Sequence, residues 1–192
     1  MSKYYDDGFN PAALSVQVSE MLVATADASD DQIDSAVTEM LQLLRQRLAM
    51  DVVFVSEFVD GQRIFRYVDT GQGKPVIPVG HSDPLEQTWC QRVVDGRLSQ
   101  FISDSSKLPN RASLPAAPFP IGTYLSTPVF LNDGQVYGTL CCFSFSPNEH
   151  IQERDLKNLQ SVAVLVAKKI SKSRAPRDAG TEPATLTLQP KW

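Results

Sequence analysis

The chain has 192 residues, of which 42% are hydrophobic and 21% charged, and its formal net charge is −4. These values are typical of a soluble globular protein with one domain, and the acidic balance argues against a nucleic-acid-binding surface. No apolar run approaches the ~18 residues of a membrane span, and the N-terminus MSKYYDDGFNP lacks the order of a signal peptide. The odd set of three cysteines, with Cys141 and Cys142 adjacent, indicates no disulfide framework. We therefore expect a cytoplasmic protein with reduced thiols, no membrane contact and no bound nucleic acid.

Two amphipathic helices are predicted near the N-terminus. Residues 1–10 have no apolar periodicity and are expected to be flexible. Asn10 and Pro11 are a typical N-cap and first helical residue, and an apolar stripe from Leu14 to Thr25 follows. A second helix opens at a capping box. Its cap pair is Ser29 and Gln32, and its stripe is Ile33, Val37, Met40, Leu41, Leu44 and Leu48.

Two hairpins are predicted after Asp51. The first joins VVFVSEF to QRIFRYV through Asp60-Gly61. The second joins GTYLSTPVFL to QVYGTLCCFSF through a turn at residues 132–134. Hairpins at both ends of the strand set indicate an antiparallel sheet.

Between the hairpins, a short helix and a long loop are predicted. Asp83-Pro84-Leu85-Glu86 has the pattern of a helix start, and Gly96 would end that helix. Residues 99–120 contain a brief strand, Gln100 to Ser103, and then a loop rich in serine, proline and alanine. Loops of this length are usually functional or disordered.

A last helix is predicted after Pro147-Asn148, with its apolar stripe on Leu156, Leu159, Ala163, Val166 and Ile170. The folded domain is expected to span residues 11–172. The tail, residues 173–192, lacks apolar periodicity and is expected to be disordered. The fold class is therefore α+β: an antiparallel sheet with the N- and C-terminal helices on one face and the short helix and long loop on the other. Such a cover over a small sheet makes a closable pocket.

Three local patterns, in this order and spacing, resemble the GAF domain family. The first is YLSTPVF, from Tyr124, similar to the family's S-x-x-x-P-hydrophobic strand. The second is DGQVYGTL, from Asp133, similar to its D/N-G-x-x-x-G-x-L hairpin. The third is IQERDL, from Ile151, similar to its closing-helix start. The resemblance extends over about residues 12 to 172 and implies the same α+β layers, a small-molecule ligand and dimerisation through the terminal helices.

The chemically distinctive subgroups of this family each lack a matching motif here. Bilin-binding members attach the chromophore to a cysteine followed by histidine, whereas Gln91 follows Cys90. Haem would need an axial ligand, and the candidates are His81 and His150, which lack ligand spacing. The dispersed cyclic-nucleotide motif is absent from the sequence. We therefore expect no bilin, haem or metal cofactor.

Four residues are predicted to line the pocket: Trp89, Arg92, Phe101 and Tyr124. Arg92 would pair with an acidic ligand. The alternative interpretation makes Trp89 ordinary core and Arg92 a solvated side chain. Tyr124 and Ser126 share a strand face, and the alternation does not assign that face to the pocket or to the helices. Consecutive Cys141 and Cys142 should point to opposite faces of the sheet. We interpret both as packing residues, and redox sensing is the alternative.

The leading hypothesis is a ligand-binding sensory domain, without enzymatic activity, that acts as a homodimer on a separate signalling output protein. The first alternative is a thiol-redox enzyme on the same fold, similar to the free methionine sulfoxide reductases. The second is a pure dimerisation module whose pocket is filled by its own side chains.

Overall fold

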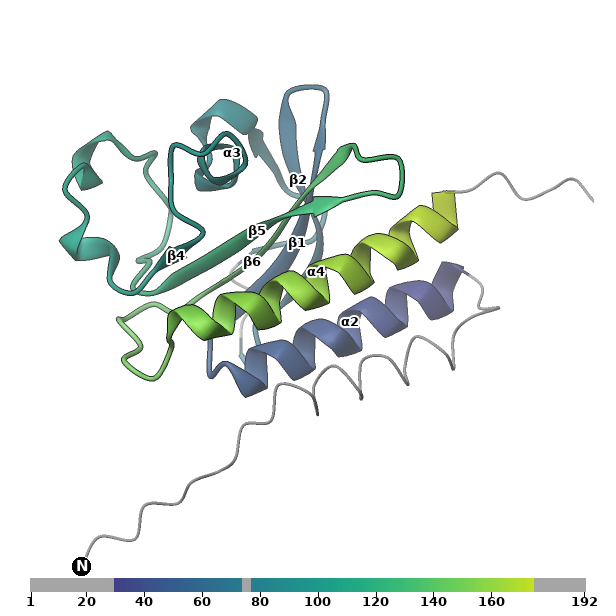
Figure 1. Cartoon of the computed structure of the whole chain (residues 1–192), viewed down its shortest axis with the longest axis horizontal. Coiled ribbons are helices and arrows are strands. Elements are labelled where there is room, and N and C mark those ends of the chain that lie inside the picture. Colours follow the sequence, from purple (N-terminus) through teal and green to yellow (C-terminus); the bar gives the residue numbers. More distant parts are fainter. Residues whose placement is uncertain (1–29, 74–76, 175–192) are drawn as a thin grey trace, which may run out of the picture.

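A six-stranded antiparallel sheet forms the centre of the computed structural model, which describes residues 30–73 and 77–174 (Figure 1). The strand order is β3-β2-β1-β6-β5-β4, with the two long hairpins side by side. The helices are α2 (Asp30–Arg47), α3 (Trp89–Val94) and α4 (Glu153–Arg174). The strands are β1 (Val52–Val59), β2 (Gln62–Asp69), β3 (Ser82–Pro84), β4 (Phe101–Ile102), β5 (Tyr124–Phe130) and β6 (Val136–Phe143). The α+β fold predicted from the sequence is confirmed.

The two long helices lie next to each other on one face of the sheet (Figure 1). The predicted stripe of α2 is buried from Val37 to Leu48, and the α4 stripe is buried at Leu159, Ala163, Val166 and Ile170. These side chains pack on the alternate residues of the strands that point toward them, among them Val53, Val55, Leu125, Leu140 and Cys142. Burying each such aliphatic side chain contributes about 1.5–3 kcal/mol.

The other face of the sheet carries a second, separate core. Its members include Val52, Phe54, Tyr124, Cys141 and Phe143, which alternate along the strands with the residues under the helices. The segment 77–121 covers this face, with α3 as its helical part. The sheet is therefore buried on both faces, and the cover over this second face is built mostly from loop.

The prediction that the short helix begins at Asp83-Pro84-Leu85-Glu86 is wrong. Residues Ser82–Pro84 form β3, which pairs antiparallel with Gln62–Ile64 of β2, and a 3₁₀ turn at Leu85–Gln87 follows. The α-helix begins later, where the hydroxyl of Thr88 accepts a hydrogen bond from the backbone N–H of Gln91 at 3.2 Å. The acidic residue before a proline was the misleading signal, since a carboxylate there also suits an edge strand with a cross-strand arginine.

The last helix continues beyond the predicted domain boundary at 172. Arg174 ends α4, forms an ion pair with Glu57 of β1, and lies 4.8 Å from the ring centroid of Tyr137. Glu57 is 5% exposed and has a second partner in Arg66, whose Nε lies 2.5 Å from the carboxylate. The C-terminal end of α4 is thus attached to the central strand by a buried charge.

Several expectations fall on residues outside the described ranges. The flexible start at residues 1–10, the first predicted helix, the cap at Ser29 and the tail from residue 175 belong to this group. Within residues 30–73 and 77–174, no helix is long and apolar enough to cross a membrane.

Gly138 sets how closely the two central strands approach. A Cβ at this position would lie 1.9 Å from the backbone oxygen of Ser56, the strand neighbour, so the backbone itself would have to move. We expect Gly138→Ala to destabilise the fold by about 3 kcal/mol or more. This corresponds to a fall in melting temperature of roughly 6 to 12 °C, measured by thermal unfolding.

The matched control is Gly134→Ala, in the turn of the same hairpin, where a Cβ meets nothing within 4 Å. An alanine at this position is disfavoured only by the positive φ of 81°, which should lower the free energy of unfolding by about 1–2 kcal/mol. Equal losses for both variants would contradict the close approach of β1 and β6.

Candidate functional site

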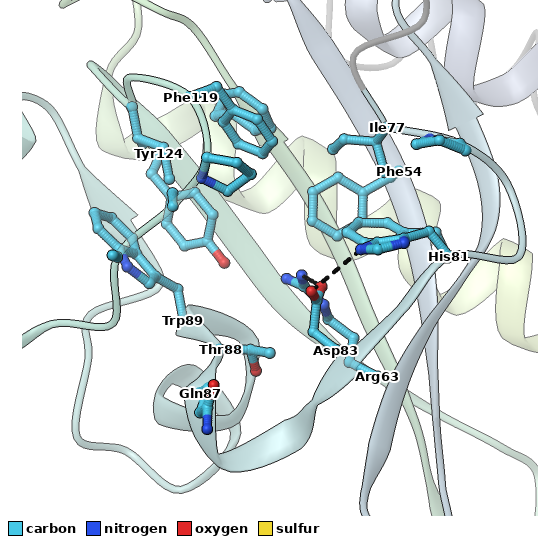
Figure 2. Close-up of a pocket in the computed structure, with 17 residues that line it drawn as sticks. Phe54, Arg63, Ile77, His81, Asp83, Gln87, Thr88, Trp89, Phe119 and Tyr124 are labelled. Atoms are coloured by element: carbon cyan, nitrogen blue, oxygen red, sulfur yellow. Dashed lines mark hydrogen bonds and ion pairs between the residues drawn. The ribbon is translucent and has the colours of Figure 1, made fainter.

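A cavity of about 150 Å³ lies between the sheet and the segment 77–121 (Figure 2). Its apolar wall is largely aromatic and comes from β1, β2, α3, β5, β6 and the long loop. The aromatic members are Phe54, Phe65, Trp89, Phe119, Tyr124 and Phe143, and the polar members are Arg63, His81, Asp83, Gln87 and Thr88. An apolar cavity of about 150 Å³ holds a molecule the size of benzene. The position of the cavity agrees with the sequence-based expectation of a pocket under this layer.

Aromatic pairs give the cavity rigid walls. Phe119 of the loop stacks on Phe143 of β6 with ring centroids 4.9 Å apart, and Phe54 meets Phe65 edge-on at 4.9 Å. Trp89 and Tyr124 meet edge-on at 5.3 Å. Figure 2 shows Trp89 and Tyr124 on one side of the cavity and Phe54 on the other. Edge-to-face and offset pairs of this kind are worth about 0.5–1.5 kcal/mol each beyond their burial.

Trp89 also holds the long loop in place. Its indole N–H donates a hydrogen bond to the backbone oxygen of Pro115 at 3.0 Å, and the guanidinium of Arg111 lies 5.2 Å from its ring centroid. The residues after Pro115, Ala116 to Phe119, are the part of the loop that lines the cavity. Trp89 is therefore one of the side chains that attach the loop over the cavity, together with Phe119, which stacks on Phe143.

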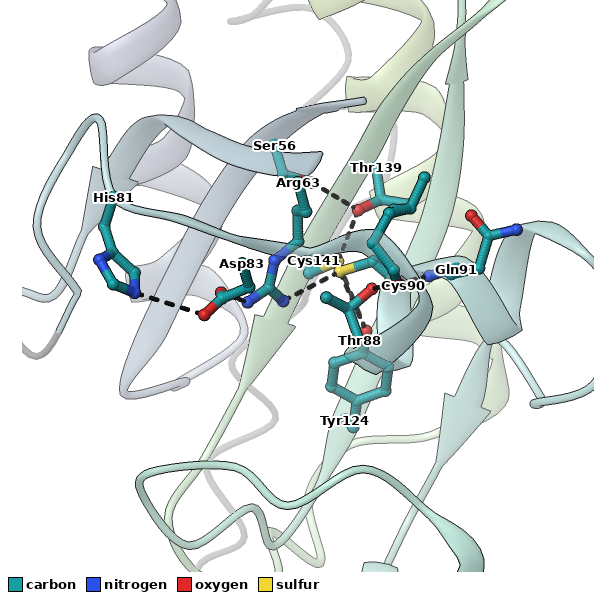
Figure 3. A network of polar contacts seen from close by, with 11 residues as sticks. Ser56, Arg63, His81, Asp83, Thr88, Cys90, Gln91, Tyr124, Thr139 and Cys141 are labelled. Atoms are coloured by element: carbon teal, nitrogen blue, oxygen red, sulfur yellow. Dashed lines mark hydrogen bonds and ion pairs between the residues drawn. The ribbon is translucent and has the colours of Figure 1, made fainter. Parts of the chain in front are cut away.

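Charged groups meet at one end of the cavity. Arg63 of β2 forms an ion pair with Asp83 of β3, and Nε2 of His81 lies 3.3 Å from the same carboxylate (Figures 2 and 3). Arg63 also stacks on Phe65, with 4.3 Å between its guanidinium carbon and the ring centroid. The Nε–H of Arg63 is buried and has no hydrogen-bond partner within the described part of the chain.

Two thiols lie directly behind this wall (Figure 3). The Sγ atoms of Cys90 and Cys141 are 3.7 Å apart, and both residues are fully buried. Nη1 of Arg63 lies 3.5 Å from the sulfur of Cys90. The hydroxyl of Tyr124 lies within hydrogen-bonding reach of both sulfur atoms, 3.8 Å from Cys90 and 3.6 Å from Cys141. The two wall residues Arg63 and Tyr124 thus connect the cavity to the thiol pair.

The polar surroundings separate the pKa values of the two thiols. Burial alone would raise the pKa of Cys90, but the hydrogen bond from Cys141, the positive charge of Arg63 and the hydroxyl of Thr139 outweigh it and lower the pKa well below 9. Burial and the neighbouring Cys90 raise the pKa of Cys141 well above 9. Of the two thiols, Cys90 is therefore the one that ionises first, and its sulfur faces the guanidinium of Arg63.

Of the four predicted lining residues, the structure places Trp89 and Tyr124 on the cavity and Arg92 and Phe101 away from it. The buried face of α3 consists of Trp89, Cys90 and Val93, and Arg92 lies beside this face. Phe101 points from β4 to the opposite side of the sheet and packs against the core under the long helices. The cation at the cavity is Arg63, which the sequence analysis did not select.

In residues 30–73 and 77–174 no group of three or more histidine, cysteine, aspartate or glutamate side chains is arranged to hold a metal ion. Cys142 points to the helix-side core, away from Cys141, as strand alternation predicts.

A family model described as GAF domain matches residues 30–171. The chain belongs to the GAF domain family. Among curated proteins, this GAF chain is 29% identical over 179 residues to the diguanylate cyclase DgcP of Escherichia coli (strain K12). That match covers 90% of the chain and 51% of DgcP, so the chain spans about half the length of this relative.

Solved GAF domains have the same fold. The GAF domain of an Acinetobacter phosphoenolpyruvate-protein phosphotransferase superposes with a TM-score of 0.66 at 17% identity, covering 88% of this chain and 96% of that one. A protein described as a GAF sensor from Burkholderia vietnamiensis gives a TM-score of 0.65 at 16% identity, covering 86% and 99%. At these identities the likeness shows the fold.

The charge on Cys90 can be measured directly by the ultraviolet absorbance of its thiolate. We expect one thiolate to persist well below the ordinary thiol pKa of 9 in the wild type and to disappear in Cys90→Ala. Arg63→Met should shift this titration upward because it removes the positive charge. Since the folded-state pKa is the lower one, ionised Cys90 stabilises the fold above the unfolded-state pKa, and this contribution is lost as the pH falls through the folded-state value.

Cys142→Ala is the control for this titration, because burial raises the pKa of Cys142 and its removal should leave the low-pH step unchanged. A wild-type protein with no thiolate below the ordinary range would contradict the proximity of Arg63.

Proposed function

We propose that this GAF domain is a sensory module that binds a small planar molecule in the cavity and does not transform it. The observation that carries the proposal is a cavity of about 150 Å³ with aromatic walls and one charged end. Pockets of this composition, apolar with a few convergent polar groups, are typical of ligand sites. None of the cysteines is among the described residues that line it, which supports binding over thiol chemistry inside the cavity.

The charges at the cavity favour a neutral ligand in the reduced protein. Arg63 is already paired with Asp83 on one side and faces the sulfur of Cys90, the thiol with the lowered pKa, on the other. A ligand carboxylate would therefore add a negative charge that no further cation compensates, in a poorly solvated space. A neutral amide or heteroaromatic ring, in contrast, adds no charge and offers a donor for the carboxylate of Asp83.

The signalling role is proposed from the family and from the relative. DgcP is named a diguanylate cyclase, and the present chain covers about half of it. An output of that class, in a separate protein or in a longer chain, would receive the signal of this domain. The proposed transmission point is the ion pair between Arg174 and Glu57, which joins the C-terminal end of α4 to the sheet.

A set of three isosteric probes tests the proposed binding: benzamide, which is neutral, benzoate, which is an anion, and benzamidinium, which is a cation. Trp192→Phe leaves Trp89, at the cavity, as the one tryptophan of the chain, which otherwise has two. We expect benzamide to change the Trp89 fluorescence saturably, with a Kd of about 1 mM or lower for a fragment of this size. Benzoate should bind the reduced protein more weakly.

Ala117→Phe and Ala112→Phe form a matched pair of loop variants. Ala117 lines the cavity, whereas Ala112 is exposed and does not line it. The ring added at 117 should abolish benzamide binding, and the ring added at 112 should leave it unchanged. Absence of saturable binding by all three probes, or equal behaviour of the two variants, would argue for a pocket filled by its own side chains.

We further propose that the domain forms a homodimer through its long helices. Val164 supports this, because it is a large apolar side chain on α4 that is 55% exposed. The wild type should then show twice the 21.2 kDa mass of one chain in light scattering at about 10–100 µM.

Val164→Asp should shift the dimer toward the monomer. Val79→Asp is the control, because Val79 is 64% exposed but lies in the segment over the opposite sheet face. A monomeric wild type would contradict dimerisation, and equal weakening by both variants would contradict the role of α4.

A further inference from the structure

Cys90 and Cys141 come from different elements and meet on the cavity side of the sheet. Cys90 lies on α3 and Cys141 on β6, and the 3.7 Å between their sulfur atoms is van der Waals contact. A disulfide has an S–S distance of about 2.05 Å, so the two sulfur atoms would have to approach each other by less than about 2 Å. Cys142, the third thiol, belongs to the core on the opposite face.

The surroundings of this pair are polar, although both residues are completely buried. Ser126 Oγ and Thr139 Oγ1 lie 3.0 and 3.2 Å from the sulfur of Cys141, and Thr139 is in turn 2.9 Å from the hydroxyl of Ser56. Arg63 approaches the other sulfur, of Cys90. A nearby cation lowers the pKa of a thiol and favours the reactive thiolate, and Arg63 supplies that cation to Cys90.

The thiol pair is one layer of side chains away from the cavity. Arg63 and Tyr124 line the cavity and also touch Cys90. The cavity volume of about 150 Å³ is several times that of a water molecule, which takes up ~30 Å³ in the liquid. The cavity therefore has room for a small oxidant at a distance of one layer of side chains from the sulfur of Cys90.

We propose that Cys90 and Cys141 are a redox-active pair which a hydroperoxide converts to an intramolecular disulfide, and that this conversion changes the charge at the cavity. Cys90 attacks as the thiolate and Cys141 resolves. Neither step requires Cys142.

The chemistry balances in two steps. The Cys90 thiolate attacks the terminal oxygen of the hydroperoxide ROOH, the O–O bond breaks, and sulfenic acid and ROH form once the alkoxide gains a proton. The Cys141 thiol then attacks the sulfenic sulfur, and the new S–S bond displaces hydroxide, which leaves as water with the thiol proton. In sum, two thiols are oxidised, one peroxide is reduced, and one ROH and one water are released.

Disulfide formation removes the negative charge that faces Arg63. Nη1 of Arg63 loses its anionic partner, and Asp83 remains as the counter-charge. Oxidation should therefore shift the cavity from neutral toward anionic ligands, a consequence that rests on the proposed binding function. The thiol pair itself does not depend on it.

The experiment treats the full-length, ligand-free protein with hydrogen peroxide, blocks the remaining thiols after denaturation and maps the peptides by mass spectrometry. Free thiols should fall from three to one per chain, with the Cys90 and Cys141 peptides linked and the chain mass reduced by two hydrogens. Dithiothreitol should restore all three. Cys142→Ala should form the same link, and Cys90→Ala should not.

Each other outcome overturns the redox pair: three thiols that stay reduced, a link that includes Cys142, a link between two chains, or Cys90 oxidised without a link. The wild-type peptide map decides these without any variant, so a misfolded Cys90→Ala would not obscure the result.

The second arm repeats the benzoate and benzamide titrations on the reduced and the oxidised protein. We expect oxidation to raise the benzoate affinity relative to benzamide on the order of tenfold, since one negative charge near Arg63 is lost. An unchanged ratio overturns the effect on the cavity. Absence of binding by both probes in both states counts against the binding function instead, while the peptide map still reports on the thiol pair.

Discussion

The close pairing of β1 with β6 at the centre of the sheet is the constraint on which the rest of the structure depends. Every residue from Val52 to Ser56 in β1 is buried, and six consecutive pairs join the two strands. Because successive side chains point to opposite faces, each strand supplies both cores at once. Phe54 and Cys141 thereby belong to the cavity side, while Val55 and Leu140 support the long helices. The helices and the cavity cannot be built independently, since they share these two strands.

The sequence predicted the layers of this fold better than the details of the site. The long helices and hairpins follow from strong periodicity and from turn residues, which are local signals. Arg63 was missed because its role depends on the pairing of β2 with β3, and a three-residue strand provides no pattern. An irregularity in the β1–β2 register also interrupts the alternation of β2. Phe101 was misplaced for a similar reason, because a two-residue strand does not reveal which face each side chain takes.

Arg63 connects three parts of the cavity side that are far apart in the sequence. It pairs with the edge strand at Asp83, stacks on Phe65 and approaches Cys90 on α3. A buried guanidinium needs such partners, because an isolated charge in this space would be very unfavourable. Two of these partners can change their charge: the carboxyl of Asp83 by protonation, and the thiol of Cys90 by ionisation or oxidation. Aromatic walls give the cavity its shape, and under the proposed function Arg63 and its partners determine which ligand charges it tolerates.

Ser56 and Glu57 are consecutive residues of β1 and bind on opposite sides of the sheet. Ser56 contacts Thr139, the neighbour of the thiol pair, and Glu57 holds Arg174 at the end of α4. A displacement of β1 along its own axis would strain both contacts simultaneously, because a single peptide unit separates them. The strand therefore connects the two contacts mechanically. A displacement of the C-terminal end of α4 would act on Glu57, which is adjacent to the residue that contacts Thr139 beside the sulfur of Cys141.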